Sequence, residues 1–436
     1  MSFLCALCGE IRFAPCCSAG AALIISDWPG AIAHIDADCF FAACERLRRP
    51  DLAGRPICVL SSQDACIVAK TYDAKAAGIT TGMPVWEARK LMPQAVYLQA
   101  DFRFYGLLSN KLFAILRRFS PQVEAYSIDE GFVDLDGLRG YWRMGYGEIG
   151  DAIRRTIHQE TGLTVSVGVS VTRTLAKMAS EANKPNGLSV VSGRHIAEFL
   201  SGQATRDIPG IGARRAALLG KFGLHTALEF SRAPEAQVQR LLGRTGMHLW
   251  HELNGQSLFG IQTAPALPGS MARTASLGER SSDIRLVRSH LSHHCFRLGM
   301  DMVARGYTAR HFSVMLRLGN FEHVTLAEHL PQATQHLNIM QRTATRLLHG
   351  LWREGMVVNA CGIVATQIAP AGHAQAGLFA PDAGDRETAD LPLWQAMQAM
   401  RSRFGNSIIR PANSLLRTAP PARQGRRFGY PLFVCR

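Results

Sequence analysis

Two adjacent carboxylates, Asp129 and Glu130, stand in the middle of a short apolar stretch. Residues 123–135 alternate like two short strands, so the acidic pair falls at the tip of a hairpin, and Gly131 makes a turn there easy. Two neighbouring anions repel each other unless a cation joins them. A solvated corner is the alternative, but the flanking residues are typical of a buried sheet. These flanking residues are Tyr126, Ile128, Phe132 and Val133.

A second pair of acids lies in the alternating residues 31–38. Asp36 and Asp38 share one face of the predicted strand. The residues that follow are apolar, so the end of the strand is expected to be covered, and a carboxylate there needs a partner. If Asp36 meets Asp129 and Glu130, three acidic groups surround one point. Hard-cation sites that handle phosphates have such a ligand set.

The elements that must position these acids follow from periodicity. Residues 146–161 predict an amphipathic helix, residues 163–171 an alternating strand, and residues 172–182 a second helix. With the first strand, the helix after it and the acidic hairpin, they give the β-α-β-β-α-β order of ferredoxin-like folds, interrupted by residues 50–98. A second set of elements in the same order begins near residue 272.

Length and charge limit the possible functions. The chain has 436 residues, which suggests about three domains. Its formal net charge of +14 favours a polyanionic partner, either nucleic acid or a membrane surface. No segment is long and charge-free enough to span a bilayer. Eleven cysteines, an odd and scattered number, indicate free thiols in a reducing cytoplasm.

Residues 1–30 are rich in Cys, Ala and Gly and show no helix or strand period, which predicts a disordered extension or a wrongly assigned start. Cys5, Cys8, Cys16 and Cys17 are alternative zinc ligands, although the second pair lacks the usual spacing of two residues. A signal peptide fits poorly, because the basic start is missing and the apolar run is short.

Residues 207–219 have the glycine pattern of a helix-hairpin-helix. Gly210 and Gly212 allow the N–H groups at the next helix start to approach a DNA phosphate, and Arg214 and Arg215 add positive charge. A tight turn between core helices is the alternative. Contacts of this kind position a duplex without reading its sequence.

Four motifs stand along the chain in a fixed order: His34–Glu45 (HIDADCFFAACE), Ser127–Glu130 (SIDE), Leu175–Ser180 (LAKMAS) and Asn183–Gly187 (NKPNG). They resemble the Y family of translesion DNA polymerases, close to bacterial polymerases IV and V, from about Ala31 to Pro370. The resemblance implies an α+β right-hand polymerase with a ferredoxin-like palm, small fingers, a helical thumb with the helix-hairpin-helix, and a ferredoxin-like little finger. The implied domains are palm 31–49 and 99–192, fingers 50–98, thumb 193–262 and little finger 263–370, followed by a linker and basic tail 371–436.

The resemblance also implies an activity, the addition of deoxynucleotides to a primer 3′ end opposite damaged or undamaged template. Asp36, Asp129 and Glu130 would be catalytic and would hold two divalent ions, which we take to be Mg²⁺. The backbone carbonyl of Ala37 would be a further ligand. A catalytically silent, polymerase-like DNA-binding scaffold of a mutagenesis complex is the main alternative, and loss of the acidic triad would mark it. A nucleotide cyclase on a related palm is a weaker one.

Four residues are implied to bind the incoming nucleotide. Phe41 lies where the family has an aromatic that closes off the sugar 2′ position; a core Phe is the alternative. Tyr72 and Lys75 lie where the family has a Tyr and an Arg on the triphosphate, so Lys75 departs from the pattern and lacks the bidentate fork. Lys184 lies at a helix exit where the family places a lysine on the triphosphate. A surface lysine is the alternative for both lysines.

A linker rich in Pro, Gly, Ala and Asp contains Gln375, Leu378 and Phe379. This pattern resembles the family's peptide for the sliding clamp, whereas the alternative is a loop with two incidental apolar residues. The expected partners are primer-template DNA, deoxynucleoside triphosphates and the clamp. The chain is predicted to be monomeric and cytoplasmic, without membrane contact, and to carry a short amphipathic helix near residues 394–404.

Overall fold

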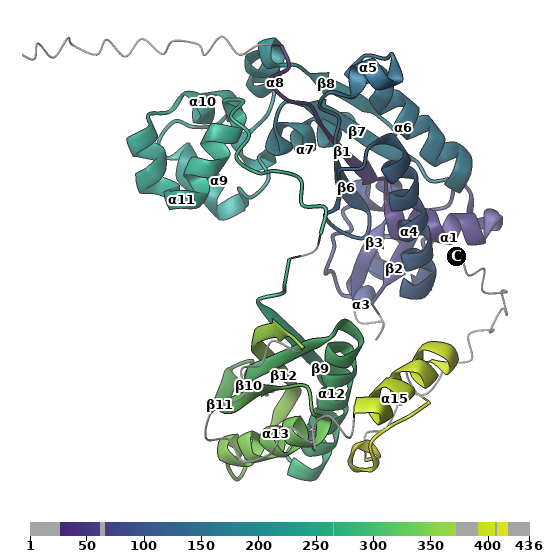
Figure 1. Cartoon of the computed structure of the whole chain (residues 1–436), viewed down its shortest axis with the longest axis vertical. Coiled ribbons are helices and arrows are strands. Elements are labelled where there is room, and N and C mark those ends of the chain that lie inside the picture. The colour runs from purple at the N-terminus through teal and green to yellow at the C-terminus, as the bar shows by residue number, and fades with distance from the viewer. Residues whose placement is uncertain (1–26, 62–65, 265, 372–390, 406–407, 417–436) are drawn as a thin grey trace, which may run out of the picture. The chain divides into compact units, whose positions relative to one another are not determined.

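The computed structural model describes residues 27–61, 66–264, 266–371, 391–405 and 408–416. The chain divides into two compact units, Met1–Pro265 and Ala266–Arg436. Both units contain helices and strands (Figure 1), which confirms the predicted α+β class.

The first unit is built around a five-stranded sheet of order β5-β6-β1-β7-β8. Its strands are β1 (Ile32–Ala37), β5 (Val123–Ala125), β6 (Glu130–Asp134), β7 (Val165–Ser170) and β8 (Leu188–Val191). The predicted β-α-β-β-α-β order is present, and β8 extends the sheet by pairing parallel with β7. The first helix of that order is α4 (Phe102–Phe119), and not the helix directly after the first strand, α1 (Phe40–Arg48).

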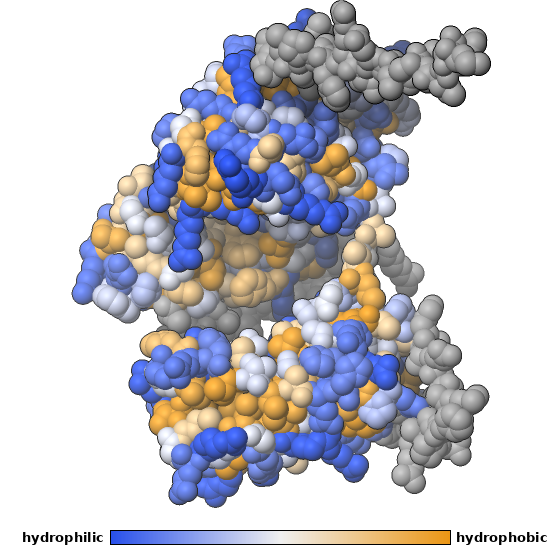
Figure 2. Space-filling model, turned by 90° about the vertical axis from the view of Figure 1, so that its left-hand side faces the viewer, coloured by the Kyte–Doolittle hydropathy of each residue, from blue (hydrophilic) through white to orange (hydrophobic). Residues whose placement is uncertain are grey.

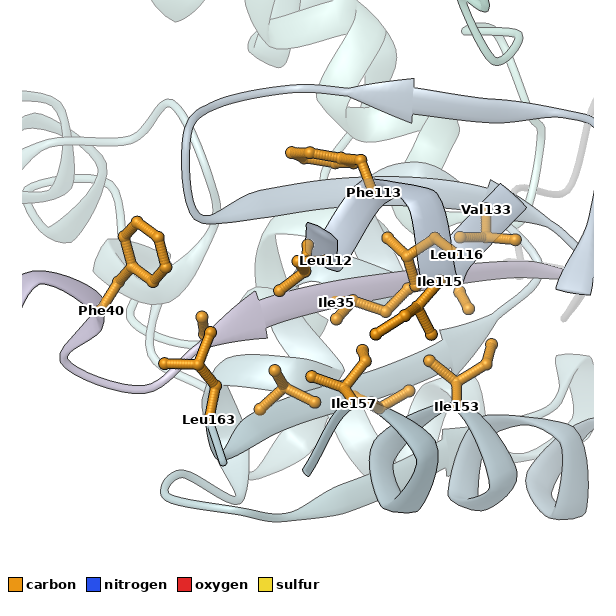
Figure 3. Packing of buried hydrophobic residues seen from close by; sticks show 14 of the residues in the cluster. Ile35, Phe40, Leu112, Phe113, Ile115, Leu116, Val133, Ile153, Ile157 and Leu163 are labelled. Carbon is orange, nitrogen blue, oxygen red and sulfur yellow. The ribbon is translucent and has the colours of Figure 1, made fainter. Parts of the chain in front are cut away.

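One face of this sheet is apolar and is covered by α4 and α6 (Tyr146–Thr161). Figure 3 shows side chains from both helices, among them Leu116 and Ile157, gathered at the sheet. Ile35 and Ala37 of β1 contribute to this core, and so do Ile153 and Ile157, four residues apart on α6. Burying one such large side chain contributes about 1.5–3 kcal/mol. Because side chains alternate along a strand, this core turns the even-numbered residues of β1 to the opposite face.

The opposite face of the sheet is crossed by α7 (Arg173–Ala182). Gly168 of β7 permits a close approach, since a Cβ there would lie 2.1 Å from the Ala176 carbonyl oxygen and 2.3 Å from the Ser180 amide nitrogen. Gly168 is also the cross-strand partner of His34. The backbone of α7 therefore passes close to the polar face of β1.

Gly131 lies inside β6 and not in the hairpin turn, which corrects the expectation that it eases a turn. It pairs with Ile35 of β1 and Ala125 of β5. A Cβ on Gly131 would lie 2.6 Å from the Phe113 ring and 2.8 Å from the Glu124 carbonyl oxygen. The glycine thus serves the packing of α4 against the sheet.

Two smaller parts complete the first unit. A sheet of order β3-β2-β4 has its own apolar core with two helices. Its elements are β2 (Ile57–Leu60), β3 (Ile67–Lys70), α2 (Tyr72–Ala76), α3 (Val85–Leu91) and β4 (Val96–Gln99). The short α5 (Leu138–Trp142) follows β6. A helical part with a further core contains α8 (Ile196–Ser201), α9 (Ala213–Gly220), α10 (Ala227–Arg232) and α11 (Glu235–Leu253).

The second unit has the predicted element order in a four-stranded antiparallel sheet. The elements are β9 (Ser270–Ser281), α12 (Ile284–Arg305), β10 (Tyr307–Leu318), β11 (His323–Thr334), α13 (Leu337–Leu351) and β12 (Val358–Pro370). The strand order is β11-β10-β12-β9, so the first strand lies at an edge, whereas β1 of the first sheet is central. Periodicity predicts the order of elements along the chain but not which strands pair.

The amphipathic helix expected near the C-terminus is α15 (Leu391–Phe404), and it packs on α12. Trp394 of α15 joins Phe296, Met300 and Leu337 in a small apolar core. Asn413 donates a hydrogen bond to Gln341 Oε1 at 2.9 Å. The described part of the C-terminal segment therefore belongs to the second unit.

The described helices include none that is both long and apolar enough to cross a membrane. On the face drawn in Figure 2, hydrophilic side chains cover much of the surface, and hydrophobic ones gather in patches between them. Large exposed apolar residues of α15 include Leu393 and Phe404, which are 54% and 59% exposed.

Because α7 lies so close to the sheet, adding one methyl group at Gly168 should lower the stability of the first unit. Gly168→Ala places a Cβ against the α7 backbone and should destabilise the first unit by about 1–3 kcal/mol, because backbone cannot move aside as a side chain can. The thermal unfolding midpoint measures this. The matched control is Gly106→Ala in α4, where a Cβ meets nothing within 4 Å and Ala favours the helix. Equal midpoints for the two variants would contradict the prediction.

Candidate active site

The acidic residues meet where β1 and β6 pair. Asp36 of β1 is directly opposite Glu130, the first residue of β6. The amide of Ala37 donates to the carbonyl oxygen of Asp129 at 2.9 Å. The register of the two strands therefore brings the three predicted acids and Ala37 to the same end of β1.

Like charges directly opposite each other destabilise an antiparallel pair, so these carboxylates need cations. Lys184 Nζ lies 2.7 Å from Asp36 Oδ1. Lys177 of α7 pairs with Glu130 Oε2. His34, which is fully buried, lies with its Nε2 3.1 Å from the same Glu130 oxygen. The acidic pair is thus neutralised by side chains of α7 and the residues that follow it.

The two carboxyls differ in proton affinity. Burial raises the pKa of Asp36 to about 6, although the Lys184 ammonium opposes the shift. Burial acts on Glu130 in the same direction, but the hydrogen bonds with His34 and Lys177 outweigh it and lower its pKa to about 2. Burial lowers the pKa of His34, so its ring is neutral at pH 7. Asp36 is therefore the less compensated carboxylate and gains more from a further cation.

Two carboxylates of a three-residue group suit a divalent cation. Ligand atoms of His34, Asp36 and Glu130 lie within 4.8 Å of one another. Carboxylate oxygens are the hard ligands that Mg²⁺ prefers. Asp129 is outside this group, and its Oδ1 accepts a hydrogen bond from the Ser127 hydroxyl. The structure thus brings Asp36 and Glu130 together through their side chains and attaches Asp129 through its backbone.

Asp38 has a different role from Asp36, although the strand pattern placed both on one face. Its side chain is buried and accepts hydrogen bonds from the Ser166 hydroxyl and the Asn186 amide, both at 2.8 Å. The Tyr72 hydroxyl also donates to it, at 3.3 Å. Asp38 therefore ties β7, the segment after α7 and α2 together.

The predicted nucleotide-binding residues lie around this junction. Tyr72 is the first residue of α2, and Lys75, one turn further on, is exposed. Phe41, in the first turn of α1, is half-buried and stacks on Tyr105 with ring centroids 4.6 Å apart. Phe41 is thus braced at the margin of the core. Lys184 contacts Asp36 as described.

A cavity of about 320 Å³ opens beside these residues, with Asp38, Cys39, Tyr72 and Asn186 in its lining. Cys39 is the N-cap of α1 in a left-handed conformation, with φ 47°, and its side chain makes no capping hydrogen bond. The first amides of a helix have no partner within the helix and attract anions. The start of α1 therefore favours an anionic ligand at the cavity.

The predicted helix-hairpin-helix surrounds the start of α9. Gly210 has a φ of 94°, which favours glycine, and Gly212 is the N-cap. A Cβ on Gly212 would meet nothing within 4 Å, so no contact within the described chain requires a glycine there. Arg214 and Arg215 are exposed, and Arg215 donates to the Gly210 carbonyl oxygen at 2.9 Å.

Sequence reasoning assigned no role to His34, Lys177 or Ser180, although all three fall within quoted motifs. The spacing of Lys177 and Ser180 on one predicted helix was the available signal, because residues three apart share a helix face. The clamp-peptide residues Gln375, Leu378 and Phe379 lie outside the described residues.

Comparison with known proteins gives two family matches. The impB/mucB/samB family matches residues 35–181, and its C-terminal domain matches residues 268–378. Together they cover more than half of the chain. Protein ImpB of Salmonella typhimurium is 30% identical over 359 residues, 79% of this chain and 84% of that protein. DNA polymerase IV of Moorella thermoacetica is 31% identical over 390 residues, 87% of this chain and 95% of that protein.

Solved structures agree on the fold. A chimera of the Y-family DNA polymerases Dbh and Dpo4 matches with a TM-score of 0.68 at 21% identity, over 78% of this chain and 99% of that chain. An insertion ternary complex of Dbh DNA polymerase matches with a TM-score of 0.55 at the same 21% identity, over 78% of this chain and 99% of that chain. The chain therefore belongs to the impB/mucB/samB family, the Y family of translesion DNA polymerases.

Proposed function

We propose that this protein is a template-directed DNA polymerase of the translesion type, which adds deoxynucleotides to a primer 3′ end. The observation that carries the proposal is the pairing of Asp36 directly opposite Glu130, with Asp129 attached by the Ala37 amide. Like charges directly opposite each other destabilise an antiparallel pair, and a bound metal ion would lower that cost beyond what the two lysines do. The relatives named DNA polymerase IV supply the reaction class.

The domain assignment follows from the same proposal. The five-stranded sheet with its helices is the palm (31–49 and 99–192), and the three-stranded sheet is the fingers (50–98). The helical part is the thumb (193–262), and the four-stranded sheet is the little finger (263–370). The division of the chain after Pro265 falls beside the proposed boundary between thumb and little finger. A monomeric chain acting in the cytoplasm is part of this proposal.

Asp36, Asp129, Glu130 and the Ala37 carbonyl would hold two Mg²⁺ ions. Such ions lower the pKa of the primer hydroxyl and stabilise negative charge on the triphosphate and the departing pyrophosphate. The chain's own part is to hold the carboxylates in a fixed arrangement. The strand register does so for Asp36 and Glu130.

The triphosphate would lie between α1, α2 and Lys184. The uncapped start of α1 offers amide donors, and Lys184 adds an ammonium. The hydrogen bond with Asp38 fixes the Tyr72 hydroxyl near the cavity. The ammonium of Lys75 would act as a point charge, without the two parallel hydrogen bonds of an arginine.

On the DNA side, Gly210, Gly212, Arg214 and Arg215 would position the duplex through its phosphates.

The catalytically silent scaffold is the weaker hypothesis. Loss of acidic residues at the end of β1 would favour it, and all three are present. Lys177 and Lys184 compensate the acids under either hypothesis, so the acids themselves decide between the two.

Asp129→Asn should abolish primer extension, because it removes one of three negative charges that hold the cations. Loss of several kcal/mol of transition-state stabilisation corresponds to roughly a 10²- to 10³-fold lower rate. Primer-template affinity should change little, since the proposed DNA contacts lie elsewhere. The matched control is Asp151→Asn on α6, whose carboxylate pairs with Arg154 at 2.8 Å on the surface. Wild-type extension by Asp129→Asn would reject the site.

Phe41→Ala should raise ribonucleotide incorporation about ten- to hundredfold, with a smaller effect on deoxynucleotides, because a pocket wall excludes a hydroxyl by steric contact. Competition assays with the two nucleotide types measure the ratio. The matched control is Phe102→Ala, because Phe102 contacts the Phe41 ring edge-on at 5.6 Å and is 49% exposed. The same change in both variants would assign the effect to packing and not to a sugar contact.

Leu378→Ala combined with Phe379→Ala should leave clamp-free extension unchanged and remove stimulation by a loaded sliding clamp. A tethered apolar peptide raises the effective concentration of the enzyme at the primer, and its anchors carry most of the binding energy. The matched control replaces Leu393 and Phe404, exposed apolar residues of α15, with Ala. Stimulation that survives the first pair of changes would place the tether elsewhere.

A further inference from the structure

His34 is a buried polar residue to which the proposed reaction assigns no role. It is 0% exposed and lies on β1, two residues before Asp36. Its ring packs against Phe132 with centroids 4.7 Å apart. A buried polar side chain costs stability unless its polar atoms have partners, and a hydrophobic residue would fill this place without that cost.

Both ring nitrogens of His34 have partners from different elements. Nδ1 lies 2.7 Å from the Ser180 hydroxyl of α7, and Nε2 lies 3.1 Å from Glu130 Oε2 of β6. The Glu130 carboxylate is ionised and can only accept, so the N–H of the neutral ring lies on Nε2. Nδ1 is then left to accept from the Ser180 hydroxyl, which also lies 2.8 Å from the Lys177 carbonyl oxygen. A chain of hydrogen bonds therefore runs from α7 through β1 to β6. Because both nitrogens are engaged, neither offers a lone pair to a metal ion.

The contacts on Glu130 fall on one oxygen. His34 and Lys177 both approach Oε2. Among the described residues, no hydrogen bond reaches Oε1. A carboxylate held by one oxygen from behind presents the other in a fixed direction, and hydrogen bonds of this kind to ligating carboxylates set metal affinity.

We infer that His34 is a positioning residue, which fixes the Glu130 carboxylate through its Nε2–H so that Oε1 faces the metal ions. This inference rests on the proposed polymerase function. Gly168 contributes indirectly, because the close approach of α7 that it permits places Ser180 within reach of Nδ1. Ser180 holds the ring, and the ring holds the carboxylate.

The test compares His34→Asn with His34→Gln in the full chain. A glutamine amide reaches the place of Nε2 and still donates to Glu130, whereas an asparagine amide reaches only the place of Nδ1. Two quantities are measured for each variant. One is the Mg²⁺ concentration that half-saturates primer extension. The other is the affinity for Mn²⁺, measured by electron paramagnetic resonance on a complex with dideoxy-terminated primer and deoxynucleotide, in which no bond forms.

His34→Asn should raise the half-saturating Mg²⁺ concentration and lower the Mn²⁺ affinity, each about ten- to hundredfold. Both values for His34→Gln should stay within about threefold of wild type. DNA affinity should be the same for both. Equal metal affinities in the two variants overturn the inference: equally strong binding makes His34 dispensable for the metal site, and equally weak binding makes the imidazole itself a ligand. A lower unfolding midpoint with wild-type metal affinity also overturns it, since the role is then structural.

Ser180→Ala covers the case in which neither His34 variant folds. It removes the partner of Nδ1 but keeps the buried ring, and it should weaken Mn²⁺ affinity severalfold; wild-type affinity overturns the inference. The Mn²⁺ measurement also separates the two proposals. A wild-type protein that fails to extend primers rejects the polymerase function, whereas one that extends them while the variants bind Mn²⁺ normally rejects only the role of His34.

Discussion

Asp36 and Glu130 are held directly opposite each other by the register of β1 and β6, and the rest of the site compensates this repulsion. The register cannot relax, because a shift of one residue would turn Ile35 and its neighbours out of the core beneath α4 and α6. The apolar face of the sheet thus fixes the geometry of its polar face. Because the register is fixed, the repulsion between the two carboxylates can be lowered only by cations placed near them.

Helix α7 and the residues that follow it carry a row of three cationic side chains, each paired with an acidic residue of the sheet. Arg173 pairs with Glu124 at 2.7 Å, Lys177 with Glu130, and Lys184 with Asp36 at 2.7 Å. Arg173 and Lys177 are four residues apart and therefore share one helix face. The glycine at position 168 allows this face to approach the sheet. In the proposed function this row would also supply Lys184 to the triphosphate.

Residue types and spacing predicted much of this arrangement. Alternation in residues 31–38 placed Asp36 on one face of a strand, and its meeting with Asp129 and Glu130 of the hairpin was the condition for a cation site. Three features depend on tertiary packing and escaped prediction. Gly131 was assigned to a turn but serves contact with Phe113, because close approach of a distant helix leaves no local pattern. Tyr126 was expected in a buried sheet but precedes β6 and is 55% exposed. The role of His34 depends on Ser180, which is 146 residues away.

Arg173, the first cation of the row, also contacts the chain segment that leads out of the first unit. Arg173 also donates to the Gly260 carbonyl oxygen at 2.9 Å, and Glu124 accepts from the Gln262 amide at 2.8 Å. The segment that leads out of the first unit is therefore attached to the strand pair that carries Glu130. Burial strengthens this attachment, since the two side chains are only 12% and 11% exposed and a partly buried ion pair is screened less than a surface pair. The segment is therefore held to the first unit as far as Gln262. The acidic hairpin is thus attached to the chain segment that leads out of the first unit.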